Sequence, residues 1–301
     1  MSVLPDDPAI NDPRPSSPIM PVRLSLDDNF QFRCYPGIAC FNECCRNIDI
    51  LLTPYDALRL ARRRKLTTTE FLARHAELFE MDGQGMPGVK MKTKADSREC
   101  QFLTGQGCGV YEDRPAACRY YALGATAMRP KDSHVVEDFF FVVKEPHCLG
   151  HNDPKMQTIR EYRKDQGVEI YDEMNREWRE IVLKKRSSGP TVGRPSDRSF
   201  DLFFVASYDL DSFRAFVTSA SFLDSYLVSA ALLDQVRADD AEMMWFAFRF
   251  LKQALFGEKF LDEAPGAPER RVERKRAIVE RERARMRADM EKEQDAPDQG
   301  S

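Results

Sequence analysis

Residues 34–45 read CYPGIACFNECC and residues 108–121 read CGVYEDRPAACRYY, and together they hold six of the chain's eight cysteines. The full set, all in the first half of the chain, is Cys34, Cys40, Cys44, Cys45, Cys100, Cys108, Cys118 and Cys148. Glycine, proline, asparagine and glutamate surround them, whereas a cysteine that only fills a core usually stands alone inside an apolar run. Cysteines grouped in turn-rich sequence indicate side chains that converge from loops on a bound metal, so we take all eight as candidate metal ligands.

The compartment decides between metal ligands and disulfides. The N-terminal sequence has neither the basic region nor the apolar region of a signal peptide. No apolar run approaches the roughly 18 residues that a membrane span needs. We therefore expect a bacterial-type cytoplasmic protein, because thiols stay reduced there and clustered cysteines more often bind metal. A structural disulfide framework is the competing interpretation.

Composition narrows the choice of partners. Of the 301 residues, 42% are hydrophobic and 31% are charged, as in ordinary soluble globular proteins. The formal net charge of −4 does not favour nucleic acid or an anionic membrane surface as a partner. We expect no membrane association, and we expect any protein partner to bind through the helical C-terminal half.

The chain divides by composition into four parts. Residues 1–22 are rich in proline and predict a disordered lead-in. Residues 23–150 form the cysteine-bearing domain, and residues 151–261 carry apolar side chains at three- and four-residue steps, which predicts helices that pack on it. Residues 262–301 alternate opposite charges at helical spacing and predict a charged tail, a solvated helix or a disordered segment, whose deletion should leave metal content and stability nearly unchanged. The expected fold class is α+β, mainly helical, with a small β element and loops that carry the cysteines.

Local signals place two helices within the cysteine-bearing domain. Thr53 followed by proline is typical of a helix start and predicts a helix over residues 54–63. Thr67 and Glu70 have the spacing of a capping box, which predicts a second helix over residues 68–80.

Further signals mark strands and helix ends. CQFLTGQGCGVY at residues 100–111 predicts a tight hairpin. HVVEDFFFVV at residues 134–143 is the strongest strand candidate, because it is mostly β-branched and aromatic. Gly167 is expected to break a helix, and Gly257 to end the last helix of the apolar block in a left-handed conformation.

The cysteine spacing bears on the identity of the metal. Structural zinc sites usually take ligands in pairs separated by two to four residues. Only Cys40 with Cys44 or Cys45 has that spacing. On a helical turn, the four-residue step from Cys40 to Cys44 would place both side chains on one face. Iron–sulfur clusters also use four thiolates and accept wider spacing, although no standard ferredoxin spacing occurs. The adjacent side chains of Cys44 and Cys45 are expected to diverge, and so to serve different metal atoms or opposite sides of one cluster. The spacing favours an iron–sulfur cluster over zinc.

The same residues resemble a known family. The matching motifs are Cys40-x-x-x-Cys44-Cys45, CQFL from Cys100, GCGVYEDRPAACRY around Cys108 and Cys118, and a late Cys148. This pattern, over about residues 30–150, is similar to the YkgJ family of cysteine-cluster proteins, to which zinc or iron chelation is ascribed. The family's usual opening is C-x-x-C-x-x-C-C, whereas here the first two gaps are longer. Flagellin lysine methylase carries a related motif, so the resemblance also implies a protein lysine N-methylase as the alternative function. No S-adenosylmethionine motif is visible in this sequence. The residues therefore leave open whether the protein is an enzyme.

Several polar residues near the cysteines admit two interpretations. Arg114 and Arg119 could both donate hydrogen bonds to cluster sulfurs. Alternatively, Arg114 could organise a turn and Arg119 could form a salt bridge at the surface. His147 and His151 could ligate zinc, or could be exposed loop residues. Asp56 lies in the first turn of a predicted helix, where capping explains it without a catalytic role.

Overall fold

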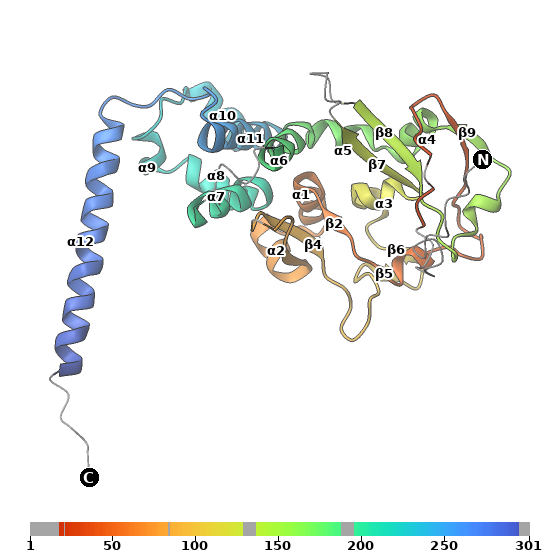
Figure 1. Ribbon diagram of the computed structural model, residues 1–301, viewed down its shortest axis with the longest axis horizontal. Helices are drawn as coiled ribbons and strands as arrows, with labels where there is room; N and C mark the ends of the chain where they lie inside the picture. The colour runs from red at the N-terminus through yellow and green to blue at the C-terminus, as the bar shows by residue number, and fades with distance from the viewer. Residues whose placement is uncertain (1–17, 21, 84, 129–136, 188–195, 295–301) are drawn as a thin grey trace, which may run out of the picture. The chain divides into compact units, whose positions relative to one another are not determined.

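The computed structural model of the chain describes residues 18–20, 22–83, 85–128, 137–187 and 196–294 (Figure 1). The chain splits into two compact units, an N-terminal unit of residues 1–209 and a C-terminal unit of residues 210–301. Helices make up 51% of the structure and strands 16%, which confirms the mainly helical α+β class with a helical C-terminal half. The finer boundaries predicted from composition stay predictions.

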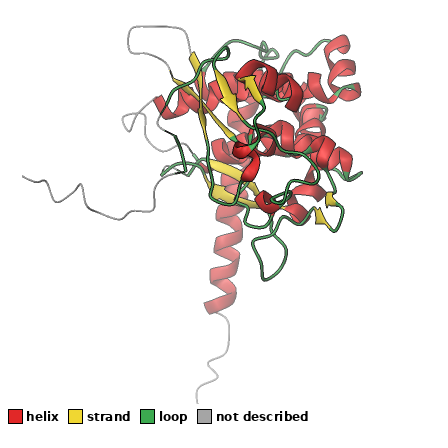
Figure 2. Ribbon diagram, turned by 90° about the vertical axis from the view of Figure 1, so that its right-hand side faces the viewer, coloured by secondary structure: helices red, strands yellow, loops and turns green. Residues whose placement is uncertain are grey.

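The strands of the N-terminal unit are short and form several separate antiparallel sheets, shown in yellow in Figure 2. The described sheets are β1 (Asn29–Gln31) with β9 (Met156–Thr158), β2 (Leu51–Leu52) with β4 (Pro87–Met91) and β3 (Ala76–Glu80), β5 (Leu103–Thr104) with β6 (Gly107–Cys108), and β7 (Leu123–Met128) with β8 (Glu137–Val142). The hairpin predicted at residues 100–111 is present as β5 and β6. The strand predicted at residues 134–143 is present as β8, although residues 134–136 fall outside the described part of the chain.

Helices surround these sheets. Those of the N-terminal unit are α1 (Pro54–Arg63), α2 (Thr68–His75), α3 (Ala116–Tyr120), α4 (Ile159–Gln166), α5 (Glu169–Met174), α6 (Arg176–Ser187) and α7 (Asp197–Tyr208). Helix α1 has the predicted bounds, and its capping box is complete, because Thr53 and Asp56 each accept the other's backbone N–H. Gly167 ends α4 with a φ of 62°, as predicted, since a residue without a Cβ adopts this conformation at little cost.

The second predicted helix is only half right. Its capping box forms at Thr67, but α2 ends at His75 and the chain continues as strand β3 instead of helix. The reason is tertiary, because β3 pairs along its whole length with β4, whose Val89 and Met91 are buried in the core. A five-residue ladder on a buried partner outweighs the local helix preference.

One aromatic core ties the beginning of the cysteine region to its end. Phe30 and Phe32 on one side and Phe140, Ile159 and Tyr162 on the other are all buried in a single cluster. The ring of Tyr162 meets those of Phe30 and Phe32 edge-on, with centroids 5.2 and 5.8 Å away. Strands β1 and β9 also pair with each other, so the segments that precede and follow the cysteine region lie side by side.

The C-terminal unit is helical where it is described. Its helices are α8 (Leu210–Val217), α9 (Ala220–Leu223), α10 (Ala230–Ala238), α11 (Asp240–Phe256) and α12 (Ala267–Gln294). Phe213, Phe222, Phe246 and Phe250 pack with ring centroids 5.3–6.5 Å apart and form its core. Helix α11 ends at Gly257 with a φ of 70°, as predicted. A protein partner at this half stays a prediction.

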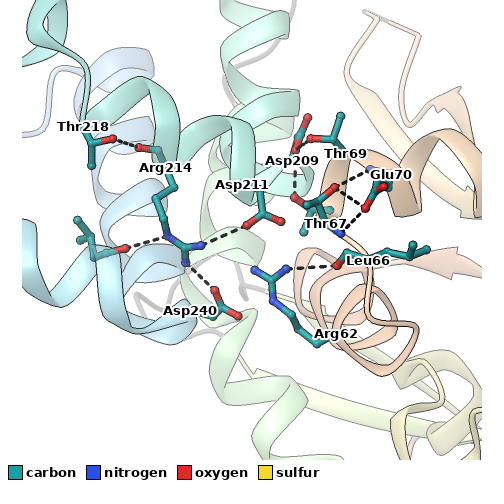
Figure 3. Close-up of polar contacts among 12 residues, drawn as sticks. Arg62, Leu66, Thr67, Thr69, Glu70, Asp209, Asp211, Arg214, Thr218 and Asp240 are labelled. Atoms are coloured by element: carbon teal, nitrogen blue, oxygen red, sulfur yellow. Dashed lines mark hydrogen bonds and ion pairs between the residues drawn. The ribbon is translucent and has the colours of Figure 1, made fainter.

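Charged contacts hold the helices of each unit in place (Figure 3). In the C-terminal unit, Arg214 binds Asp211 at 3.2 Å and Asp240 at 2.5 Å, which joins α8 to α11. In the N-terminal unit, Asp209 accepts hydrogen bonds from the hydroxyls of Thr68 and Thr69, which anchors the chain after α7 to the start of α2. Among the described residues, no helix is both long and apolar enough to cross a membrane.

The charged tail forms a long helix but is not solvated from its first residue. Along α12, Val272, Val279 and Met286 are exposed, as expected. Before it, Leu227 donates to the carbonyl of Asp262 at 2.9 Å, and Ala264 donates to that of Ser225 at 3.0 Å. Ala264 and Ala267 are buried. These contacts join residues 262–267 to the rest of the C-terminal unit, and the separability of the tail stays a prediction.

We expect two truncations to separate these parts. A chain that ends at Arg271 should keep its free energy of unfolding within about 0.5 kcal/mol, because the missing side chains that the structure describes are exposed ones of a helix. A chain that ends at Leu261 should lose about 2 kcal/mol, because two backbone hydrogen bonds and the buried alanines go with it. Urea denaturation of the two chains measures both changes, and equal losses would show that α12 itself packs on the core.

Candidate metal centre

The cysteines sit on loops and at the ends of short elements. Cys34 and Cys40 lie in the loop after β1, Cys44 and Cys45 in the 3-10 helix η2 (Glu43–Cys45), Cys100 before β5, Cys108 at the end of β6, Cys118 in α3, and Cys148 before the 3-10 helix η4 (Leu149–Asn152). All eight are free thiols, so the disulfide framework is absent from the described structure.

Backbone hydrogen bonds bring three of these segments together on one side of the centre. The N–H of Cys100 donates to the carbonyl of Cys45 at 2.7 Å. The N–H of Leu103 donates to the carbonyl of Cys100 at 3.0 Å, and Leu103 is in turn the strand partner of Cys108. Cys45, Cys100 and Cys108 are therefore neighbours through the main chain.

A second set of backbone contacts gathers the remaining loops. Arg33 donates to the carbonyl of Gly150 at 3.0 Å, which places Cys34 beside the segment that carries Cys148. The N–H of Leu149 donates to the sulfur of Cys40 at 3.2 Å. The beginning and the end of the cysteine region thus meet, as the aromatic core beneath them requires.

Backbone amides point at several of the sulfurs. Besides Cys40, the sulfurs of Cys100, Cys108 and Cys148 accept amide hydrogen bonds, each from the residue two positions ahead, and these bonds lower the pKa of each thiol. Burial is the larger cause and leaves the pKa of each of the three raised overall. A bound cation would reverse that balance, because metal binding favours the thiolate.

Cys44 and Cys45 do not diverge as the sequence predicts. The thiol of Cys45 donates a hydrogen bond to the sulfur of Cys44, which lowers the pKa of Cys44 and raises that of Cys45. The cause is the local backbone, because Glu43 donates to the carbonyl of Cys40 and Cys45 to that of Asn42, so the segment folds in tight 3-10 turns. Cys40 itself lies outside the helix, in the turn that precedes it.

Electrostatic interactions link the cysteines into one neighbourhood. Burial, together with the thiols of Cys44, Cys40 and Cys148, raises the pKa of Cys34 to about 11. Burial is the largest cause that raises the pKa of Cys118, and the thiols of Cys100, Cys44 and Cys108 raise it further. Within the described part of the chain, no three His, Cys, Asp or Glu side chains are arranged closely enough to hold one ion. The cysteines are neighbours rather than preformed ligands, and their role as ligands stays a prediction.

The segment between Cys108 and Cys118 is fixed by α1. The carboxylate of Asp113 binds the guanidinium of Arg59 at 2.5 Å and that of Arg63 at 3.8 Å. The backbone N–H of Ala116 donates to the buried carboxylate of Asp56 at 2.8 Å. The YEDRPAAC motif therefore anchors the short helix that carries Cys118, and Asp56 serves both as the expected helix cap and as this anchor.

Arg119 is not the surface residue considered in the sequence, whereas Arg114 organises a turn, because its guanidinium donates to the carbonyl of Tyr111 at 2.8 Å. Arg119 is 8% exposed, and its guanidinium donates to the carbonyls of Arg114, Glu112 and Gln166 and to the hydroxyl of Tyr171. Arg119 forms no salt bridge with any residue that the structure describes, because its N–H groups donate to the carbonyls that surround it. Arg114 stacks on the ring of Tyr111 at 4.1 Å, and its charge lowers the pKa of Cys34 and Cys108. Arg114 thus acts on the thiols by its charge, and Arg119 holds the loop.

The two histidines have different surroundings, because His147 is exposed in a turn, as one of its two interpretations predicts, and His151 is not. His151 is buried, not an exposed loop residue, and its Nε2 lies 3.1 Å from the carbonyl of Val143. His147 stacks on Tyr121, whose hydroxyl lies 3.5 Å from Nε2 of His147 and hydrogen-bonds Cys148. Sequence reasoning missed Tyr121, and its position directly after the Cys118-Arg-Tyr motif was the available signal.

The family comparison agrees with this geometry. Residues 33–149 match the model of the CxxCxxCC family, described as "putative zinc- or iron-chelating domain", and the match includes every cysteine of the chain. This part of the chain is therefore similar to the cysteine-cluster domains of that family, to which zinc or iron chelation is ascribed. No curated protein and no solved structure matches the chain. The lysine-methylase alternative gains no support.

Proposed function

We propose that residues 33–149 hold an iron–sulfur centre on cysteine thiolates, with a redox, sensing or structural role in the cytoplasm. The observation that carries the metal site is the set of amide N–H groups aimed at the sulfurs of Cys40, Cys100, Cys108 and Cys148. Fixed donors of this kind stabilise a thiolate, which is the form that binds metal. A cysteine that merely fills a core needs no such donor.

The donor set supports iron–sulfur ahead of zinc. Most of the neighbouring thiols come from segments far apart in sequence, and only Cys40 with Cys44 or Cys45 has the close spacing of zinc ligands. Hydrogen bonds to sulfur and partial burial are the means by which proteins adjust the potential of such a cluster. When bound, a cluster would supply one-electron transfer, while the amides and Arg114 hold the thiolates and set their charge environment.

Anaerobic purification from iron-replete cells tests this proposal. We expect iron and acid-labile sulfide in matching amounts and absorbance in the visible range. Zinc in stoichiometric amount without sulfide would contradict the iron–sulfur centre while leaving a thiolate site in place. Purified chain without any metal, prepared in parallel from zinc-supplemented and iron-supplemented cells, would contradict the metal site itself.

A further inference from the structure

We propose that α12 is a docking helix for a partner protein, and that it pairs with an acidic amphipathic helix of that partner along Val272, Val279 and Met286. Helix α12 belongs to the C-terminal unit, the half of the chain at which a protein partner is expected (Figure 1, blue). The inference does not depend on the proposed metal centre, whose residues belong to the N-terminal unit.

An apolar stripe runs along α12 and is left open by the residues that the structure describes. Val272, Val279 and Met286 recur at seven-residue steps, which places them on one face of the helix. They are 67%, 37% and 58% exposed, and the other residues between 271 and 287 whose burial the structure describes are exposed as well. Exposed apolar residues scattered singly are ordinary, but a stripe with a regular seven-residue step is a surface that a second helix covers.

The stripe is set in strongly basic sequence. Residues 270–287 hold nine basic and three acidic side chains, although the whole chain has a formal net charge of −4. Arg276 and Arg283 each follow a valine of the stripe by four positions, so the helical repeat places them beside it, in the line of contact with a partner helix. Both arginines are exposed, and neither forms an ion pair with any residue that the structure describes. Their charges are therefore open to a partner.

These two arginines disfavour a second copy of the chain as that partner. A parallel pair of α12 helices would set each arginine against its own counterpart, where like charges repel. An antiparallel pair would bury each arginine against apolar residues without a counter-charge. Glutamate or aspartate at the facing positions of a different helix would instead pair with both Arg276 and Arg283, and would select that helix over a second copy.

The same surface favours a protein helix over other anionic partners. Glu273, Glu280 and Glu282 lie among the arginines and would repel the phosphates of a nucleic acid, which also brings no apolar side chains to cover the stripe. A helix that lies on an anionic membrane has a broader apolar face than this single stripe. An acidic amphipathic helix supplies both the apolar contacts and the counter-charges.

A synthetic peptide tests the pairing. The probe is a labelled helical peptide of about 20 residues, long enough to cover the roughly 21 Å from Val272 to Met286. It carries leucine where it faces the stripe and glutamate where it faces Arg276 and Arg283. The control peptide has the same composition, with its leucines distributed around the helix. In fluorescence anisotropy with the full chain, the designed peptide should bind about tenfold more tightly than the control.

Substitutions on α12 locate the binding face. Val279→Ser should weaken binding of the designed peptide about tenfold, because it removes an apolar contact at the centre of the stripe. Arg283→Glu should weaken it by at least as much, whereas Arg281→Glu, the charge-matched control on the opposite face of the helix, should stay within about twofold of the wild type. Arg276→Glu with Arg283→Glu should instead bind a peptide with lysine in place of the glutamates. The chain that ends at Arg271 lacks the stripe and should not bind either peptide.

Three results would overturn the proposal. Equal affinity for the designed and control peptides would show that α12 is only a solvated charged helix. Tighter binding of single-stranded poly(U) RNA or of phosphatidylserine vesicles than of the designed peptide would make the partner a nucleic acid or a membrane. Sedimentation of the chain alone as a dimer that Val279→Ser dissociates would assign the stripe to a second copy. The circular dichroism spectrum of each variant is the control for folding.

Discussion

Replacement of Gly150 by alanine is expected to lower the free energy of unfolding by about 2–3 kcal/mol, the upper range for overpacking a core. A Cβ at this position would lie 2.6 Å from Cε2 of Phe32 and 2.9 Å from the carbonyl oxygen of Arg33. Phe32 is 1% exposed and packs against Tyr162, so its ring cannot move aside without disturbing the core. Urea denaturation of the variant against the wild type measures the loss.

Gly105→Ala is the matched control. Gly105 lies in the turn between β5 and β6, and nothing comes within 4 Å of a Cβ built there. Its free energy of unfolding should stay within about 0.5 kcal/mol of the wild type. Equal stability of the two alanine variants would contradict the close packing of Gly150 against Phe32.

The parts of the fold that the sequence predicts correctly are those set by neighbours in sequence. The helix start at Thr53, the helix break at Gly167, the left-handed helix end at Gly257 and the hairpin at residues 100–111 each depend on a few adjacent residues. Such signals act over one turn and are visible in the sequence itself.

The parts that it does not predict depend on distant partners. Strand β7 has the sequence LGATAM, whose glycine and alanines have low strand preference, and it forms because β8 pairs with it. Strand β3 replaces the end of a helix because β4 pairs with it. The pairing of β1 with β9 joins segments on either side of the whole cysteine region, and nothing local in either segment indicates it.

The candidate site divides in the same way. The cysteines can be listed from the sequence because their residue type and turn-rich setting are local. The roles of Arg119 and His151 could not be predicted from the sequence, because each depends on burial and on backbone carbonyls that other segments supply. The grouping of the cysteines likewise depends on the closure of the aromatic core, not on spacing.

Asp56 should make the stability of the protein fall as the pH rises from about 4 to about 7. Its carboxylate is fully buried and accepts hydrogen bonds from the amides of Thr53 and Ala116. Burial raises the pKa of Asp56 from 3.8 to about 6, against the opposing effect of those amides and of Arg119. A group whose pKa is higher in the folded state contributes stability below its unfolded pKa and loses it as the pH passes the folded pKa.

The size of this contribution follows from the pKa values. A rise from 3.8 to about 6 corresponds to about 3 kcal/mol. Exposed carboxylates such as Glu70 and Glu161, whose pKa values are lowered by amide and hydroxyl hydrogen bonds, change stability in the opposite direction at lower pH. A variant that lacks only the Asp56 titration is therefore needed to isolate its effect.

Asp56→Asn provides that comparison. The amide side chain cannot titrate, and like the protonated carboxyl group it keeps one carbonyl oxygen to accept an N–H bond. The free energy of unfolding of the wild type minus that of Asp56→Asn should decrease by about 3 kcal/mol between pH 3 and pH 7, because the carboxyl group must ionise in a buried position. Urea denaturation at a series of pH values measures this difference. If it stays constant or increases with pH, the amides of Thr53 and Ala116 outweigh burial, and Asp56 is an ordinary ionised helix cap.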